Sequence, residues 1–244
     1  MTTWFLIKFL TRPGYAEDFL RGQVRASPLT TFKDPIRDPA GRADPHEGTS
    51  GLFQPGRKGL VINGREFGLD LAEPARVQLN RLNHLHVVCL HAARTEPVDH
   101  FTDTPAGIEE FRRQIKVPEL CLKLGSEAIV IRDVHEFCAR MAAAAKTRGY
   151  TLVGRGPVRY YDPLDFHGWI PGNEPMFRKE RQFEFQREFR FVIDTGIIGL
   201  DTLTLSVGDL SDIALRLRSD ELNGKELIGG KIEFRPRSAA APTP

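Results

Sequence analysis

The sequence predicts an α+β fold: a single domain with a mixed or antiparallel sheet core and a few helices. Short apolar or alternating runs typical of strands outnumber helix-like segments, no internal repeat is present, and no linker-like stretch divides the chain. We expect one domain over residues 1–235. The tail at 236–244 is rich in Pro and Ala, and we expect it to be disordered.

The composition is that of an ordinary soluble globular protein. The 244 residues carry 34 Lys+Arg against 32 Asp+Glu, a formal net charge of +2, so any nucleic-acid site must be a local basic patch. Cys89, Cys121 and Cys138 form an odd set without CxxC spacing, which predicts a reducing cytosol. The apolar run Trp4–Leu10 contains Lys8 and is far shorter than the roughly 20 residues of a membrane span. We therefore expect a cytoplasmic protein with no membrane segment.

The chain opens with strand, helix and strand. Residues 4–10 predict a buried strand, residues 15–22 a short helix ended by Gly22, and residues 24–27 a second strand. The excursion at 31–58 is rich in Pro, Gly and charge and has too few apolar residues to bury itself. It is therefore either disordered or functional.

The remainder predicts mainly strands. A helix over 135–148 begins after Asp133, which can cap its N-terminus, and ends at Gly149. The strands are expected at 59–63, 84–91, 128–131, 158–161, 182–193, 203–207 and 231–234.

The strand expected at 182–193 is the most informative segment. Its alternation puts phenylalanines on one face and Glu184, Gln186, Glu188 and Arg190 on the other. Two interpretations of the polar face stay open. It is either a solvated sheet face whose acids pair with Arg190 and a cross-strand cation, or a working Gln-x-Glu whose carboxylate polarises a ribose hydroxyl or stabilises a cationic sugar transition state.

Gln186-Arg187-Glu188 resembles the Gln/Glu-x-Glu element of ADP-ribosyltransferases. The resemblance implies an ADP-ribosyltransferase-like fold, NAD as the substrate, Glu188 as the catalytic acid and Gln186 as the residue that orients the acceptor. The opening strand, helix and second strand are similar to that family too. They imply that Lys8 or Arg12 grips NAD, and that Ser27 stands in its Ser-Thr-Ser element.

A second resemblance covers most of the chain. The segment Arg42 to Gly48, with Asp44-Pro45-His46-Glu47, and the later Lys179 and Glu188-Phe189-Arg190 are similar to an uncharacterised family of bacterial and phage proteins. That family implies no activity. It points to one constellation, with substrate-binding roles for the first three of its members: Arg42, Asp44, Glu47, Lys179, Glu188 and Arg190. We expect the 31–58 excursion to bring Arg42 or Glu47 to the face of Glu188.

Aromatic and basic residues supply further candidates. Tyr161, beside Tyr160 and Arg159, can stack a nicotinamide, an adenine or an unpaired base, or can simply close a strand edge. The basic cluster that includes Lys179 and Arg190 is the best phosphate-binding candidate, for NAD or for a nucleic acid.

These observations favour an NAD-dependent ADP-ribosyltransferase, a toxin or phage-defence effector that acts on a nucleic-acid or protein acceptor. Two other functions stay open. Asp44, His46 and Glu47 with Lys179 can bind Mg²⁺ in a nuclease, although Asp44 to Gly48 also reads as a plain turn. The same basic cluster can serve a non-catalytic nucleic-acid or protein-binding module.

Overall fold

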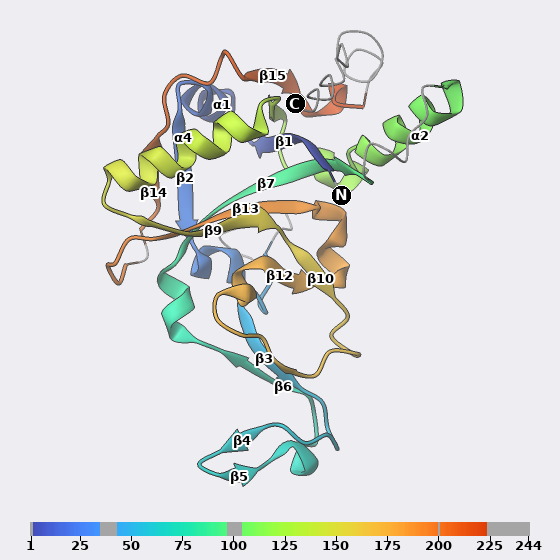
Figure 1. The fold of residues 1–244 in the computed structure, drawn as a ribbon, viewed down its shortest axis with the longest axis vertical. Coiled ribbons are helices and arrows are strands. Elements are labelled where there is room, and N and C mark those ends of the chain that lie inside the picture. Colours follow the sequence, from blue (N-terminus) through green and yellow to red (C-terminus); the bar gives the residue numbers. More distant parts are fainter. Residues whose placement is uncertain (1, 35–42, 97–103, 200, 224–244) are drawn as a thin grey trace, which may run out of the picture.

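A computed structural model describes residues 2–34, 43–96, 104–199 and 201–223. In these residues antiparallel sheets and a few helices form one α+β domain (Figure 1). The α-helices are α1 (Pro13–Leu20), α2 (Pro105–Ile115), α3 (Glu119–Leu122) and α4 (Val134–Thr147). The short 3₁₀ helices are η1 (Leu29–Lys33), η2 (Gly68–Asp70), η3 (Asn80–His84), η5 (Glu174–Phe177), η6 (Arg181–Gln186) and η7 (Ser219–Glu221).

The strands vary widely in length. They are β1 (Thr2–Leu10), β2 (Gln23–Pro28), β3 (Thr49–Phe53), β4 (Val61–Ile62), β5 (Arg65–Glu66), β6 (Ala75–Gln78), β7 (His86–Thr95), β8 (Glu127–Ile131), β9 (Thr151–Pro157), β10 (Arg159–Tyr161), β11 (Gly168–Trp169), β12 (Arg178–Glu180), β13 (Glu188–Asp194), β14 (Leu203–Ser206) and β15 (Ala214–Arg218).

The main sheet has the order β14-β2-β7-β1-β8-β15, and β13 joins the other edge of β7 and carries β9. Helices α1 and α4 lie on one face, where Phe137 and Met141 pack with Leu6 and Phe191 in the largest apolar cluster (Figure 1). Residues from α2, α3 and their connection pack on Phe5, Ile7 and Phe9 at the opposite face, for which we use the name second face. Both faces of β1 are therefore buried, as its continuous apolar sequence requires.

Strand β7 changes partner along one edge. It pairs with β2 at His86 and Val87 and with β1 from His91 onward, while β13 pairs continuously along the other edge. At Cys89, between the two partners, Lys8 Nζ donates to the backbone carbonyl at 3.0 Å. This gap between β1 and β2 opens the sheet beside the residues of the candidate site.

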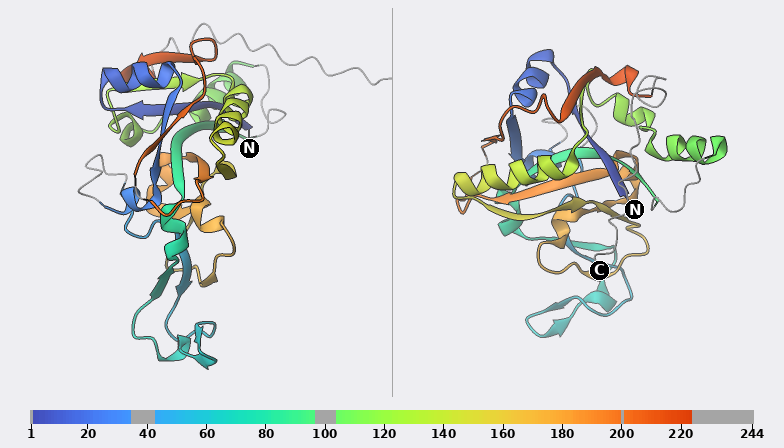
Figure 2. Two further views of the ribbon diagram at one scale, coloured as in Figure 1. Left: turned by 90° about the vertical axis from the view of Figure 1, so that its left-hand side faces the viewer. Right: turned by 45° about the horizontal axis from the view of Figure 1, so that its top comes forward.

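Smaller elements lie below the main sheet in Figure 1. Strands β3 and β6 form a long antiparallel ribbon that ends at the β4–β5 hairpin, as both views of Figure 2 show. Strand β12 pairs in parallel with β10 next to β13. The 3₁₀ helices η5 and η6 flank β12 in sequence, and together they bring Met176, Lys179 and Gln186 to β13.

The expected strands at 4–10, 24–27, 128–131, 158–161 and 203–207 are confirmed, and the one expected at 84–91 is confirmed from His86 onward. The helices α1 and α4 are confirmed too, the latter capped by Asp133. The strand expected at 182–193 is wrong for its first part. Residues 181–186 form η6, and Arg187 adopts the left-handed conformation at φ 42°, so β13 begins only at Glu188. Of the 59–63 segment, only β4 is a strand. The strand expected at 231–234 and the tail at 236–244 lie outside the described residues.

No helix in the described part of the chain has the length and apolar character needed to span a membrane.

Gly22 is the turn residue whose conformation the fold requires. Its φ is +83°, and a Cβ there would lie 2.0 Å from the backbone oxygen of Gly208. We expect Gly22→Ala to lower the free energy of unfolding by about 2–4 kcal/mol, because left-handed strain adds to a clash with backbone. Chemical denaturation measures it. Gly14→Ala is the matched control, since nothing beyond its chain neighbours and its own helix lies within 4 Å of its Cβ position; an equal loss in both variants would contradict this account.

Candidate functional site

Four charged side chains are buried together on the second face. We call Glu47, Lys179, Glu188 and Arg190 the four-charge cluster; each side chain is 10% exposed or less. Arg190 binds Glu47 through two bonds of 2.7 and 2.9 Å and donates from Nε to Glu188 at 2.6 Å. Lys179 Nζ donates to Glu188 at 2.7 Å and lies 3.6 Å from Glu47. Two cations thus neutralise two carboxylates.

Distant segments supply these groups. Glu188 and Arg190 share one face of β13, Lys179 comes from β12, and Glu47 stands in a turn in which Asp44 accepts a bond from the backbone N–H of Glu47. The Asp44–Gly48 turn expected from the sequence is therefore confirmed, and Gly48 has φ +72°. The 31–58 segment was expected to bring Arg42 or Glu47 to the face of Glu188, and this turn does so for Glu47.

Gln186, the last residue of η6, also contacts the cluster. Left-handed Arg187 separates Gln186 from Glu188, yet both side chains reach Lys179 Nζ, at 2.8 and 2.7 Å. The solvated polar face, one of the two interpretations of this segment, is wrong because Gln186, Glu188 and Arg190 are all buried. Its pairing of Arg190 with the acids is present, but in the interior.

Pairing keeps the cluster ionised. Burial acts to raise the pKa of Glu188, but Arg190 and Lys179 outweigh it and hold that pKa well below its usual value. Burial acts to lower the pKa of Lys179, and the carboxylates of Glu188 and Glu47 outweigh it and raise that pKa. Lys179, Glu188 and Arg190 therefore carry their charge at neutral pH, and their mutual attraction is strong in a poorly solvated interior.

A second polar layer lies against the cluster. Glu180, the neighbour of Lys179 in β12, accepts from Arg76 at 3.0 Å and contacts His46 Nδ1 at 2.9 Å. Asp44 is 1% exposed, and its carboxylate accepts from the backbone N–H of His46 at 2.8 Å. Burial, and then the nearby Glu47, raise the pKa of Asp44 to about 6. Asp44 thus titrates closer to neutral pH than an ordinary aspartate.

A small cavity adjoins the cluster at the gap between β1 and β2. Its volume is about 60 Å³, and we call it the Glu188 cavity. Its polar lining comes from Lys8, Lys179, Gln186, Glu188 and His91, and its apolar lining from Ile7, Phe9, Phe32, Cys89, Leu90 and Leu124. A space of this size with several polar groups can hold water.

Two buried nitrogens on residues that line this cavity lack a partner among the described residues: Gln186 Nε2 and His91 Nε2. His91 Nδ1 contacts the Gln186 carbonyl at 2.8 Å and must donate to it, which leaves Nε2 as an acceptor in the neutral ring. Burial lowers the pKa of His91 to about 4, so the ring is neutral at pH 7. The residues around the cavity therefore retain one unused donor and one unused acceptor.

The structure gathers some of the predicted site residues and separates others. Lys8, Lys179, Gln186, Glu188 and Arg190 meet at the cluster and its cavity, and Glu47 joins them. Tyr161 and Asp44 belong to the second polar layer, where burial raises the pKa of Tyr161 to about 12.

Two of the expected NAD-gripping residues lie elsewhere. Arg12 precedes α1 and its guanidinium lies over the Tyr15 ring, and Ser27 Oγ is 3.5 Å from Thr202 Oγ1. Because neither lines the Glu188 cavity, their placement gives no support for a role there. Arg42 lies outside the described residues.

Two contributors were not singled out from the sequence. His91 was expected only to make polar contacts at a strand end, and Tyr160, whose hydroxyl accepts from the Glu188 backbone N–H at 2.9 Å, only as a stacking residue. The pairing of β7 with β13 places His91 opposite Glu188 and would have identified His91 as a neighbour of the site. The sequence of one strand does not show which residue of another strand it faces.

The groups expected to bind Mg²⁺ are engaged separately. Asp44 accepts from backbone, His46 contacts Glu180 and Glu47 binds Arg190. Among the described residues no three His, Cys, Asp or Glu side chains gather in a way that could hold a metal ion. Burial raises the pKa of the Cys89 thiol to about 12, so this cavity-lining cysteine is protonated at pH 7 and is a poor nucleophile.

Removing Arg190 tests the dependence of the fold on the cluster. Arg190→Met would leave Glu47 and Glu188 with the single ammonium of Lys179, so we expect the free energy of unfolding to fall by about 3–5 kcal/mol. Urea denaturation measures the change. Arg216→Met is the matched control, since Arg216 pairs with Glu127 at a partly exposed site and should cost less than about 1 kcal/mol. Similar losses in the two variants would show that the cluster is not a major source of stability.

Asp44 makes stability depend on pH. Its pKa is higher in the folded chain, about 6 against 3.8, so folding favours the protonated form and opposes ionisation. The resulting penalty is absent below pH 4, grows between pH 4 and 6 and is full above pH 6. We expect Asp44→Asn to raise stability by about 1–3 kcal/mol at pH 8 and to change it little at pH 4. Thermal melts across this range measure the difference, and a gain that does not vary with pH would contradict the assignment.

Comparisons of the chain with protein-family models, with curated proteins and with solved structures found no match.

Proposed function

We propose that the protein is an NAD-dependent ADP-ribosyltransferase-like enzyme with an ADP-ribosyltransferase-like fold, and that Glu188 is its catalytic carboxylate. One observation carries the proposal. Lys8 from the first strand and Gln186 and Glu188 from the late segment, to which one family resemblance gives the NAD-gripping, acceptor-orienting and catalytic roles, line the same cavity. Lys8 is far from Gln186 and Glu188 in the sequence, so it is the fold that brings these residues together.

The chemistry suits an ionised carboxylate. Transfer breaks the bond between ribose C1′ and the nicotinamide nitrogen, and the bonding electrons leave with nicotinamide. Positive charge develops on the ribose, the acceptor adds to C1′, and the acceptor then loses its proton. Glu188 is ionised because Lys179 and Arg190 lower its pKa, and in the proposed reaction this carboxylate, whose two oxygens those cations hold, would stabilise the cationic sugar.

Gln186 has a matching role. Its Oε1 accepts from Lys179 at 2.8 Å, while its Nε2 has no partner among the described residues. The lysine therefore fixes the amide and leaves an N–H group to position the acceptor or a ribose hydroxyl. This is the role that a residue two positions before the catalytic acid would fill.

The cavity must widen for this reaction. At about 60 Å³ it is far smaller than the pockets of roughly 300–1,000 Å³ that hold small ligands. Phe32 from η1 and Leu124 after α3 line it. Short 3₁₀ segments and connections are easier to displace than the strands, so we infer that NAD enters as these two side chains move apart.

The test is release of nicotinamide from NAD, measured by chromatography with and without nucleic-acid and protein acceptors. We expect Glu188→Gln to lower the rate by at least about 100-fold. Because this change removes one partner of a buried ion pair, circular dichroism must show that the variant is folded at the assay temperature. Lys8→Gln supplies a second variant outside the four-charge cluster, and we expect it to raise KM for NAD.

Glu184→Gln is the control, since Glu184 belongs to the same segment but is exposed. It should keep the wild-type rate. Absence of nicotinamide release from the wild-type protein with every acceptor class, or full activity in folded Glu188→Gln, would refute the proposal.

A further inference from the structure

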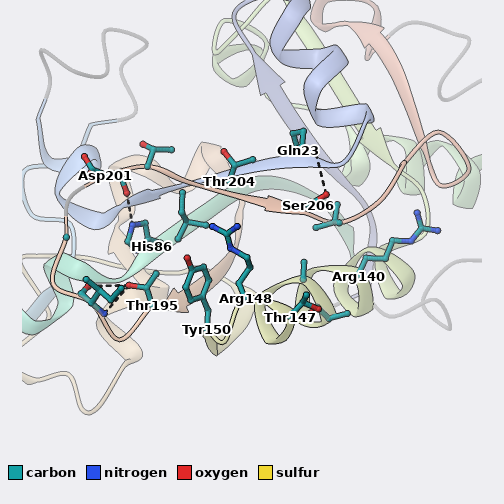
Figure 3. A pocket seen from close by; sticks show the side chains of 17 residues that line it. Gln23, His86, Arg140, Thr147, Arg148, Tyr150, Thr195, Asp201, Thr204 and Ser206 are labelled. Carbon is teal, nitrogen blue, oxygen red and sulfur yellow. Dashed lines mark hydrogen bonds between the residues drawn. The ribbon is translucent and has the colours of Figure 1, made fainter.

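A second, much larger hollow lies on the α4 face of the main sheet, away from the Glu188 cavity. It has a volume of about 840 Å³, and we call it the β14–α4 groove (Figure 3). The C-terminal half of α4 forms one wall and β14 the other. Figure 3 shows His86 and Asp201 at one end and Arg140 at the other, with Arg148 and Tyr150 between them.

The α4 wall follows from helical spacing. Arg140, Ala143, Ala144 and Thr147 recur at intervals of three and four residues and therefore share one side of the helix. On the β14 wall, neighbouring residues of both parities, Leu203 and Thr204 among them, line the groove. The groove thus runs along the edge of β14 and not over one of its faces, and β14 has no strand partner on that edge among the described residues.

Arg148 is the cation in the groove that is not paired with a carboxylate of the described residues and can therefore bind an anionic ligand. It follows α4 directly, lies 5.7 Å from the centroid of the Tyr150 ring, and points across the groove towards β14 in Figure 3. No carboxylate of the described residues pairs with it. Arg140 differs, because Glu136 and Asp212 both bind its guanidinium. A guanidinium stacked on an aromatic ring is suited to hold a phosphate.

The rest of the lining supplies hydroxyl groups and flat apolar surface. The hydroxyls belong to Thr147, Thr195, Thr202, Thr204 and Ser206. Ala143, Ala144 and Ile197 contribute apolar area. His86 is held at one end by the Asp201 backbone carbonyl, 2.8 Å from its Nε2, and the Asp201 side chain is the single carboxylate among the described residues of the lining. Such a surface can bind a phosphate, several sugar hydroxyls and an aromatic ring together.

We propose that the β14–α4 groove is a binding site for a mononucleotide, with the phosphate on Arg148, the ribose hydroxyls towards Thr204 and Ser206 of β14, and the base against Ala143 and Ala144 of α4. The volume suits this class, since it lies in the range of small-ligand pockets and exceeds what a phosphate alone would fill. The site is distinct from the Glu188 cavity: the two hollows share no lining residue.

Isothermal titration with AMP on the full chain tests the site, with adenosine and inorganic phosphate as its two fragments. We expect AMP to bind more tightly than either fragment, because the phosphate contact with Arg148 and the base contact with α4 are then made together. Arg148→Ala should weaken AMP by about 10- to 100-fold, the usual effect of losing hydrogen bonds to a charged group, and should leave adenosine unchanged. Ala143→Trp should block AMP and adenosine alike, since Ala143 is exposed on the α4 wall and a large ring there fills the groove.

Lys146→Ala is the matched control, because it removes an exposed charge from the same end of α4 outside the groove lining. It should bind AMP as the wild type does, and so should Glu188→Gln, which separates this site from the proposed catalytic one. The proposal fails if wild-type protein does not bind AMP, if Arg148→Ala and Lys146→Ala bind it equally, or if Glu188→Gln abolishes binding while Ala143→Trp retains it.

Discussion

The Arg190 guanidinium is the contact that holds the Asp44–Gly48 turn, η5 and β12 against β13. It is 1% exposed, binds both oxygens of Glu47 and one of Glu188, and donates to the Met176 carbonyl at 2.8 Å. An unpaired charge at this depth would cost several kcal/mol, so the turn that carries Glu47 and the strand that carries Lys179 have one acceptable position each. The cluster thereby fastens β12 and the Asp44–Gly48 turn to β13, although Glu47 and Arg190 are 143 residues apart.

Stability alone does not account for this polar interior. A buried ion pair seldom stabilises a protein more than apolar side chains of the same volume would. The residues around the cluster also include groups that oppose folding. Asp44 is buried with a raised pKa, and Gln186 Nε2 and His91 Nε2 are buried without partners among the described residues. Groups of this kind concentrate where a protein binds or transforms a ligand, because function there outweighs a few kcal/mol of stability. These features support the proposal that the cluster belongs to a functional site.

The sequence predicted the regular parts of the fold and the residues of the candidate site, but not that these residues are buried. Alternation and capping located β1, β7, β8 and α4 because apolar spacing and an Asp133 cap act locally. The 182–193 segment alternated as a half-exposed strand does, yet left-handed Arg187 ends η6 inside it, and the partners that bury its polar face come from β12 and the distant turn. Strands such as β9, with Gly154 and Gly156 in its interior, have too weak a pattern to be found. The constellation of Glu47, Lys179, Glu188 and Arg190 came from resemblance, since periodicity contains no information about which distant charges pair.

Strands β7 and β13 separate the two hollows and set how they can influence one another. His86 lines the β14–α4 groove and His91 lines the Glu188 cavity, and the odd spacing between them puts the two rings on opposite faces of β7. Over this stretch β7 pairs with β13 without a register shift, from His86 opposite Ile193 to His91 opposite Glu188. A ligand in the groove therefore cannot touch Glu188 directly. Any effect of one site on the other must pass through a small rotation or slide of this strand pair, and a ladder that is buried and continuous resists both. The geometry accordingly favours independent binding at the two proposed sites.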